Sequence, residues 1–204
     1  MNTYYQQLNI LIGQAIDATP TIKQQFYDFL KQRQHDYHHR DHFGGHITSS
    51  ILLVDENMQE TLLVAHKKAH KWLQPGGHWD DIREFCLDSA LREAQEECFG
   101  VHYSDQKNVP IEVLLNGQAL DIDVHEIQGH LHFDIAFLGK IKRESNIEVS
   151  PESHDVEWFL MDNAITHKLK YDDRVHRMIK KVIALRPELS NDDDCQPRFR
   201  INPK

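Results

Sequence analysis

The sequence has few cysteines and no long apolar run, and both shortages exclude classes of protein. Its 204 residues include three cysteines, Cys86, Cys98 and Cys195, without a Cys-x-x-Cys pair or a disulfide-like spacing. The segment Leu8–Ile16 is interrupted by polar residues and follows no basic stretch. These features indicate neither a signal peptide nor a membrane span. We therefore expect a cytoplasmic protein without a membrane partner, in which Cys86 and Cys98 are small core residues.

Positive charge is also scarce. Lysine and arginine together number 23 against 32 acidic residues, the formal net charge is −9, and no dense basic cluster occurs. Sequence-independent binding of nucleic acid depends on such clusters, so we expect no nucleic-acid partner. An acidic protein that acts on an anionic substrate needs a cation between the two. The length and the 40% hydrophobic content suit one domain with an extension.

The most informative stretch runs from residue 73 to residue 101, where a Pro-Gly-Gly turn precedes a predicted helix. Apolar residues recur there at helical spacing and form one stripe, at Leu87, Ala90, Leu91, Ala94 and Cys98. Glu93 lies three residues before Glu96 and four before Glu97, so the three carboxylates are helical neighbours. They repel one another at the negative end of the helix dipole. Mg²⁺ or Mn²⁺ would offset this charge, whereas a solvated acidic face is the ordinary alternative.

This stretch resembles the Nudix box, whose pattern is Gly-x5-Glu-x7-Arg-Glu-U-x-Glu-Glu-x-Gly-U, with U apolar. Residues from Glu84 to Glu97 match at every defined position. Six residues separate Gly77 from Glu84 and two separate Glu97 from Gly100, one more than the pattern in each case. Both extra residues lie outside the segment from Glu84 to Glu97, so the register of the carboxylates is kept.

A second resemblance to Nudix proteins lies late in the chain, where Glu152 precedes an apolar-x-Trp-Phe strand at residues 156–159. Together the two matches cover about residues 45 to 165. The resemblance implies an α/β fold, namely an α/β/α sandwich around a central mixed sheet. It also implies hydrolysis of a nucleoside diphosphate linked to another group, so the expected partner is a small nucleotide-derived diphosphate.

The resemblance further implies roles for individual residues. The metal ion, Mg²⁺ or Mn²⁺, would be held by Glu93, Glu96 and Glu97. One of the carboxylates Glu96, Glu97 and Glu152 would accept the proton of the attacking water. Glu84 and Arg92 would form an ion pair that fixes the loop against the helix.

Candidate residues for binding phosphate or substrate flank the box: Gly76, Gly77, His78, Lys71, His132 and Asp134. The glycines would allow close approach of the backbone to phosphate, whereas Lys71 is ordinarily a surface charge. In the predicted strand of residues 130–141, His130, His132 and Asp134 share one face. That face is a binding wall, a second set of metal ligands or a hydrogen-bonded sheet surface. A His-x-His-Phe-Asp strand of this kind resembles one subgroup of Nudix proteins. Aromatic residues that could stack on a base, or fill the core, are Phe43, Trp72 and Trp79.

Outside the Nudix-like region at residues 45–187, the chain begins with a predicted helical hairpin in residues 1–44, with helices at 2–17 and 21–35. Three roles are compatible with this hairpin: a homodimer contact, a lid over the substrate pocket or, as the most ordinary alternative, an extension that only packs against the domain. The segment from His35 to His46 holds five histidines and is either a transition-metal site or a solvated linker. A helix is expected at residues 173–185, and residues 188–204 are expected to form a flexible tail.

Two other functions remain open from the sequence. A non-catalytic module that binds a nucleotide or diphosphate on a Nudix fold would explain the two inserted residues. A prenyl-diphosphate isomerase of the same fold would need a catalytic cysteine and glutamate in a histidine-rich metal pocket. The histidines are present, but no cysteine lies in a matching strand and loop.

Overall fold

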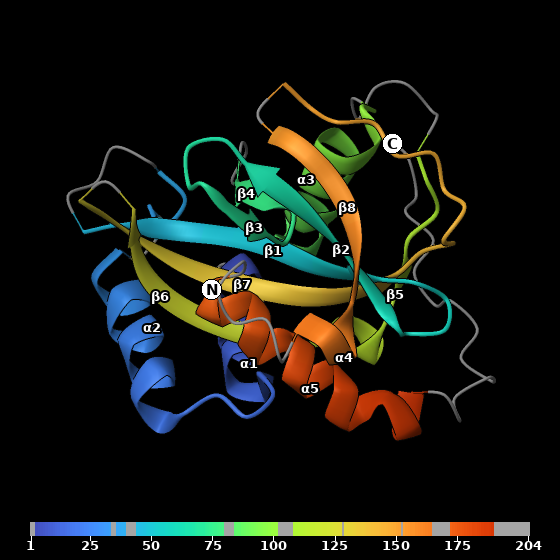
Figure 1. Ribbon diagram of the computed structural model, residues 1–204. Coiled ribbons are helices and arrows are strands. Elements are labelled where there is room, and N and C mark those ends of the chain that lie inside the picture. The colour runs from blue at the N-terminus through green and yellow to red at the C-terminus, as the bar shows by residue number, and fades with distance from the viewer. Residues whose placement is uncertain are drawn as a thin grey trace.

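The structure, a computed structural model, describes residues 3–33, 36–39, 44–79, 84–101, 108–127, 129–151, 153–164 and 172–189. In these residues a mixed sheet of eight strands carries helices on both faces (Figure 1). The elements in chain order are α1 (Thr3–Gln14), α2 (Pro20–Arg33), β1 (His46–Val54), β2 (Glu60–His66), β3 (Lys71–Leu73), β4 (Gly76–His78), α3 (Cys86–Phe99), β5 (Glu112–Val113), a 3₁₀ helix (Leu115–Gly117), β6 (Asp121–Ile127), β7 (His130–Lys140), β8 (Ser153–Leu160), α4 (Met161–Ala164) and α5 (Asp173–Leu189).

Strand β1 is the centre of the sheet. It runs parallel to β7 along its whole length, from His46 opposite His132 to Val54 opposite Lys140. On its other edge β1 pairs first with β4 and then, at its end, with β2. Strand β8 pairs with β2, whereas β5 and β6 pair with β7. This topology confirms the predicted mixed sheet, and the parallel pair lies where both strands are almost entirely buried.

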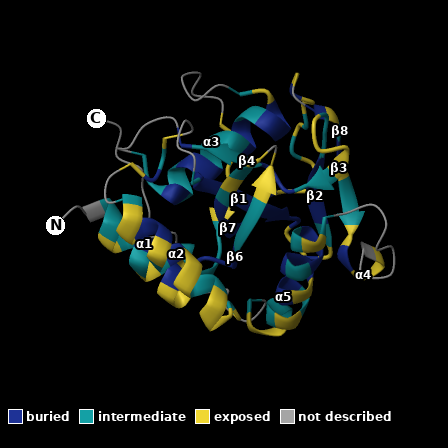
Figure 2. Cartoon of the chain, turned by 90° about the vertical axis from the view of Figure 1, so that its left-hand side faces the viewer, coloured by how far each residue is buried: buried dark blue, intermediate teal, exposed yellow. Residues whose placement is uncertain are grey.

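Alternating side chains of the sheet fill two hydrophobic layers. Ile47 and Ile51 of β1 face the layer that holds α1, α2 and α3, whereas Leu52 packs with Met178 and Ile179 of α5 on the opposite face. In Figure 2 the middle of the sheet and the inner sides of the helices are buried, whereas exposed residues follow the outer sides of the helices and the end of β6. The helices thus cover both faces of the sheet, as the predicted α/β/α sandwich requires.

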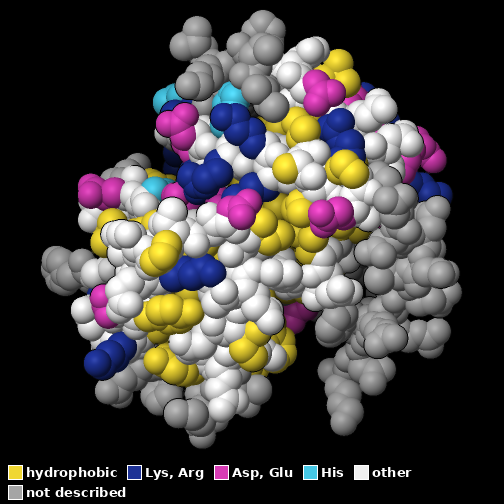
Figure 3. All heavy atoms as spheres, turned by 90° about the horizontal axis from the view of Figure 1, so that it is seen from below, with side chains coloured by type: hydrophobic (Ala, Val, Ile, Leu, Met, Phe, Trp, Pro, Cys, Tyr) yellow, Lys and Arg dark blue, Asp and Glu magenta, His cyan; other side chains and the backbone are white. Residues whose placement is uncertain are grey.

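The N-terminal helices share the core of the sheet. Phe26, Phe29 and Leu30 of α2 are buried, and the ring of Phe29 stacks on Phe133 of β7 at 4.0 Å between centroids. A hairpin that buries aromatic side chains in this way packs as an extension of the core. From the side of α1, α2 and α5, acidic and basic side chains are mixed rather than separated by sign (Figure 3). None of the described helices combines the length and apolar composition that a membrane span requires.

Three local predictions differ from the structure. The expected Pro-Gly-Gly turn is not a turn at its glycines, because Gly76–His78 form strand β4 along β1. The sequence of residues 111–115 also predicts a strand, but only Glu112–Val113 form one, since the next residues turn with positive φ angles at Leu115 and Asn116. Helix α5 continues beyond residue 185 to Leu189. Residues 190–204 of the expected tail lie outside the described residues.

Candidate active site on helix α3

Helix α3 is fixed by its apolar stripe and by a glycine at its end. Ala90, Ala94 and Cys98 are fully buried against the sheet, as the periodicity predicts. Gly100 ends the helix in the left-handed region at φ 62°, and its N–H donates to the carbonyl of Gln95. Cys98 and Phe99, the two residues between Glu97 and Gly100, are both buried. The helix therefore accommodates the additional residue without moving its carboxylates.

Arg92 binds two glutamates of α3, Glu93 and Glu96, and also Glu84, which precedes the helix. Its Nη1 lies 3.0 Å from Glu93 Oε1 and 3.3 Å from Glu96 Oε2, and its Nε lies 3.0 Å from Glu84 Oε1. Its Nη2 also donates to the backbone carbonyl of His78 at 2.8 Å, which ties α3 to β4. The Arg92 side chain is only 11% exposed, so solvent screens these contacts less than those of a surface ion pair. The guanidinium of Arg92 thus contacts three carboxylates.

The two glycines of β4 form a wall against which two carboxylates lie. Glu97 is buried, and its Oε2 accepts a hydrogen bond from the Gly76 N–H at 2.9 Å. A Cβ on Gly77 would lie 2.4 Å from the carboxylate of Glu93, so only glycine permits this approach. Carboxylates crowded against backbone carry a desolvation cost that a cation would offset. Their hard oxygen donors fit Mg²⁺ or Mn²⁺.

The side chain of His78 points away from α3. His78 pairs with Thr48 of β1, whose side chain belongs to the other face of the sheet. There the structure brings together the histidine cluster, which consists of His46, His78, His125, His130 and His132. The ring centroid of His46 lies 4.7 Å from that of His78 and 4.6 Å from that of His132. Burial, together with the neighbouring histidines, lowers the pKa of His132 to about 3.

Asp134 and Lys71 lie apart from the α3 carboxylates. Asp134 is buried, and its two oxygens accept hydrogen bonds from Thr48 at 2.8 Å and Ser50 at 2.6 Å. These surroundings are those of a structural carboxylate rather than of a group open to substrate. Lys71 is exposed on β3 and forms an ion pair with Asp172 at 3.1 Å.

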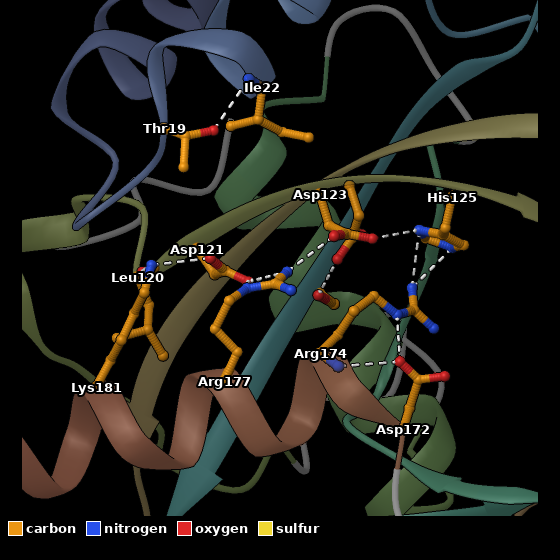
Figure 4. A network of polar contacts seen from close by, with 12 residues as sticks. Thr19, Ile22, Leu120, Asp121, Asp123, His125, Asp172, Arg174, Arg177 and Lys181 are labelled. Carbon is orange, nitrogen blue, oxygen red and sulfur yellow. Dashed lines mark hydrogen bonds and ion pairs between the residues drawn. The ribbon is translucent and has the colours of Figure 1, made fainter.

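Helix α5 adds a basic stripe that the sequence reading missed (Figure 4). Arg174 lies 2.7 Å from His125 Nε2 and donates to Asp172 at 2.8 Å, whereas Arg177 contacts Asp121 and Asp123. Burial alone would raise the pKa of Asp172, but hydrogen bonds from Arg174 outweigh it and hold that pKa below its usual range. The sequence does contain a signal for this stripe. Basic residues recur at helical spacing at positions 174, 177 and 181, and acidic residues alternate along β6 at Asp121 and Asp123.

The remaining candidates are core residues or lie outside the described part. Trp79 is buried and donates to the hydroxyl of Ser49 at 2.7 Å, so it belongs to the core rather than to a stacking surface. Cys86 and Cys98 are buried too, and burial raises the pKa of both thiols. Residues outside the described part are Glu152, Phe43, His35, His42 and Cys195.

Comparison with solved structures identifies the fold. The chain is similar to a C. elegans Ap4A hydrolase, at 18% identity and a TM-score of 0.56 over 70% of this chain and 98% of that one. It is also similar to a Nudix-family hydrolase from Clostridium perfringens, at 19% identity and a TM-score of 0.54 over 69% and 97% of the two chains. The Nudix domain of Shewanella oneidensis NrtR, solved in complex with ADP-ribose, matches at 15% identity and a TM-score of 0.51 over 76% and 96%.

No protein-family model and no curated protein matches the sequence. The solved structures nevertheless show that the chain has the Nudix fold, as the box on α3 and the late Trp-Phe strand predict.

Proposed function

We propose that the protein is a metal-dependent hydrolase that cleaves the pyrophosphate bond of a nucleoside diphosphate linked to another group. The observation that carries this proposal is the grouping of three carboxylates on α3 beside β4: Glu93 and Glu96 contact Arg92, and Glu97 accepts a hydrogen bond from Gly76. Such a set of oxygen donors is suited to Mg²⁺. The Nudix-fold neighbours include an Ap4A hydrolase and a domain bound to ADP-ribose, which supports a nucleotide-derived substrate.

Each residue of the site would have a defined part in the reaction. Glu93, Glu96 and Glu97 would hold the ion, and a magnesium ion there would screen the diphosphate and acidify a water molecule. Water attacks phosphorus, the bridging P–O bond breaks, and Glu96, Glu97 or Glu152 accepts the proton. Arg92 would position Glu93 and Glu96, and its ion pair with Glu84 would keep α3 in place.

The substrate would approach over β4. Gly76 and Gly77 are half-buried there and have no side chains, which would allow phosphate to come close to the backbone. His78 and His132 would line the path on the far side of β4, with Lys71 at a greater distance. Asp134 would act by holding Thr48 and Ser50 in the sheet, not by touching the substrate.

Two alternative functions fit these residues less well than the hydrolase does. A binding module without turnover would share the fold, but it has no need to keep three like charges together on one helix. A prenyl-diphosphate isomerase needs a reactive thiolate, and the two described cysteines are buried with raised pKa values.

The proposal is tested by measuring release of phosphate, after treatment with phosphatase, from a panel that includes Ap4A and ADP-ribose. Each compound is assayed with Mg²⁺, with Mn²⁺ and with a chelator. We expect metal-dependent release from a subset of the panel. The Glu97→Gln variant should keep its fold, because an amide oxygen can still accept from Gly76, and should lose turnover by about 100-fold or more.

The matched control is Glu144→Gln, which neutralises an exposed glutamate in a loop and should turn over like the wild type. Wild-type turnover in Glu97→Gln would remove α3 from the mechanism. Tight metal-dependent binding of a compound without any release would establish the binding module instead.

A further inference from the structure

The histidine cluster lies on the face of the sheet opposite the α3 carboxylates. Strand register places three of its members in a row across adjacent strands: His46 on β1, His132 on β7 and His125 on β6. His78 on β4 pairs with Thr48, two residues beyond His46, and its ring lies 4.7 Å from that of His46. The fifth, His130, precedes His132 by two residues and therefore shares its face. Three segments far apart in the sequence thus deliver imidazoles to one end of the sheet.

Three of these side chains approach one another as metal ligands do. One ring nitrogen each from His46, His130 and His132 lies within 4.8 Å of the other two. Imidazole nitrogens bound to tetrahedral zinc at about 2.05 Å are roughly 3.4 Å apart. The two ring nitrogens that lie farthest apart must therefore approach each other by about 1.4 Å, and rotation of the side chains supplies this movement. His46 is only 1% exposed, whereas His130 and His132 are half-buried, so the group is closed on one side and reachable on the other.

The alternation of β7 directs two of the histidines toward the cluster. Leu131 lies between the two histidines and is 38% exposed, whereas His130 and His132 take the inward positions. Leu131 shares its face with Phe133 and Ile135, which are buried in the layer of α1, α2 and α3. The opposite face of the same strand therefore carries two imidazoles that meet a third from β1.

We propose that His46, His130 and His132 form a site for a divalent transition-metal ion of the zinc class. Imidazole nitrogen suits zinc, copper, nickel and iron, whereas the hard ion Mg²⁺ prefers the oxygen donors of α3. Three histidines leave a fourth tetrahedral position, as in zinc sites that bind water or a substrate oxygen. The ring of His78 lies beside this group, 4.7 Å from that of His46. The site does not depend on the hydrolysis proposed above.

The test uses the full chain, stripped of metal with a chelator and titrated with Co²⁺, whose visible absorption reports tetrahedral nitrogen ligands. We expect the wild type to bind Co²⁺ tightly at one site. Zinc should displace this Co²⁺, whereas an excess of Mg²⁺ should not. His130→Asn and His132→Gln should each weaken binding by about 100-fold. Thermal unfolding shows whether each variant is folded, and one folded variant is enough to measure the loss of Co²⁺ binding.

Two controls separate this site from other donors in the chain. Glu97→Gln alters the carboxylate site and should bind Co²⁺ like the wild type. The double variant His35→Asn/His42→Asn, which shortens the N-terminal histidine run, should do the same. Absence of tight binding in the wild type, displacement by Mg²⁺, or loss of binding in either control would overturn the proposal.

Discussion

Replacing Gly77 with alanine tests whether the contact between β4 and the α3 carboxylates supports turnover. The new Cβ would lie 2.4 Å from Cδ and Oε1 of Glu93. Carbon atoms in favourable contact lie about 3.5 to 4.0 Å apart, so the carboxylate must move by roughly 1 Å. A displacement of about 1 Å in a positioned group can reduce turnover by about 100-fold.

The same substitution should leave the fold intact, because the group that moves is the end of a flexible side chain. Alanine is also favoured over glycine in a strand by about 0.5 to 1 kcal/mol. We therefore expect the free energy of unfolding to change by less than about 1 kcal/mol. Initial rates of phosphate release with Mg²⁺, and unfolding in urea, measure the two effects separately.

Two further glycines serve as comparisons. At Gly76 a Cβ would lie 2.4 Å from Ser50 Cβ and 2.7 Å from the backbone oxygen of Ser49, so Gly76→Ala should destabilise the fold by about 1 to 3 kcal/mol. At Gly13 the nearest atom is 3.6 Å away, so Gly13→Ala should retain both turnover and stability. Wild-type turnover in a folded Gly77→Ala protein would refute the role given to Glu93.

Two other predictions concern the polar network of α5. The Nζ of Lys181 is buried and lies 2.8 Å from Asp121 Oδ1, and it also donates to the carbonyl of Ile16, so Lys181→Met should lower the free energy of unfolding in urea by about 3 kcal/mol. Equal stability of this variant would show that the pair contributes nothing. The carboxylate of Asp172, whose folded pKa is held below 3.8, stabilises the fold above that pH and loses this contribution as the pH falls toward the folded value. Asp172→Asn should therefore be less stable than the wild type by about 2 kcal/mol near neutral pH, with a difference that shrinks in acid; a difference that does not depend on pH would contradict this assignment.

The carboxylate site shows how far local sequence rules reach. The spacing of Glu93, Glu96 and Glu97 and the apolar stripe at Ala90 and Ala94 both follow from the 3.6-residue period of a helix, and α3 has both features. The glycines of β4 were expected as a turn, since local preference favours one there. They form a strand because β1 offers a free edge, and this is a property of the assembled sheet.

The histidine cluster shows where such rules end. By sequence, His46 belongs to the run that begins at His35, and His78 belongs to the glycine segment. In the fold, both lie beside His132, because β1 pairs in parallel with β7 and β4 pairs with β1. No local pattern specifies a parallel register between strands so far apart.

The sequence by itself determined the helix of carboxylates and the alternation of the strands, because these depend on periods of two and 3.6 residues within single segments. It indicated the Nudix fold through its resemblance to the Nudix box, not through these periods. Only the tertiary structure decided which faces meet. It put the carboxylates against the glycines, and the histidines of four strands together on the opposite face, because strand pairing and burial of the two hydrophobic layers act between distant segments.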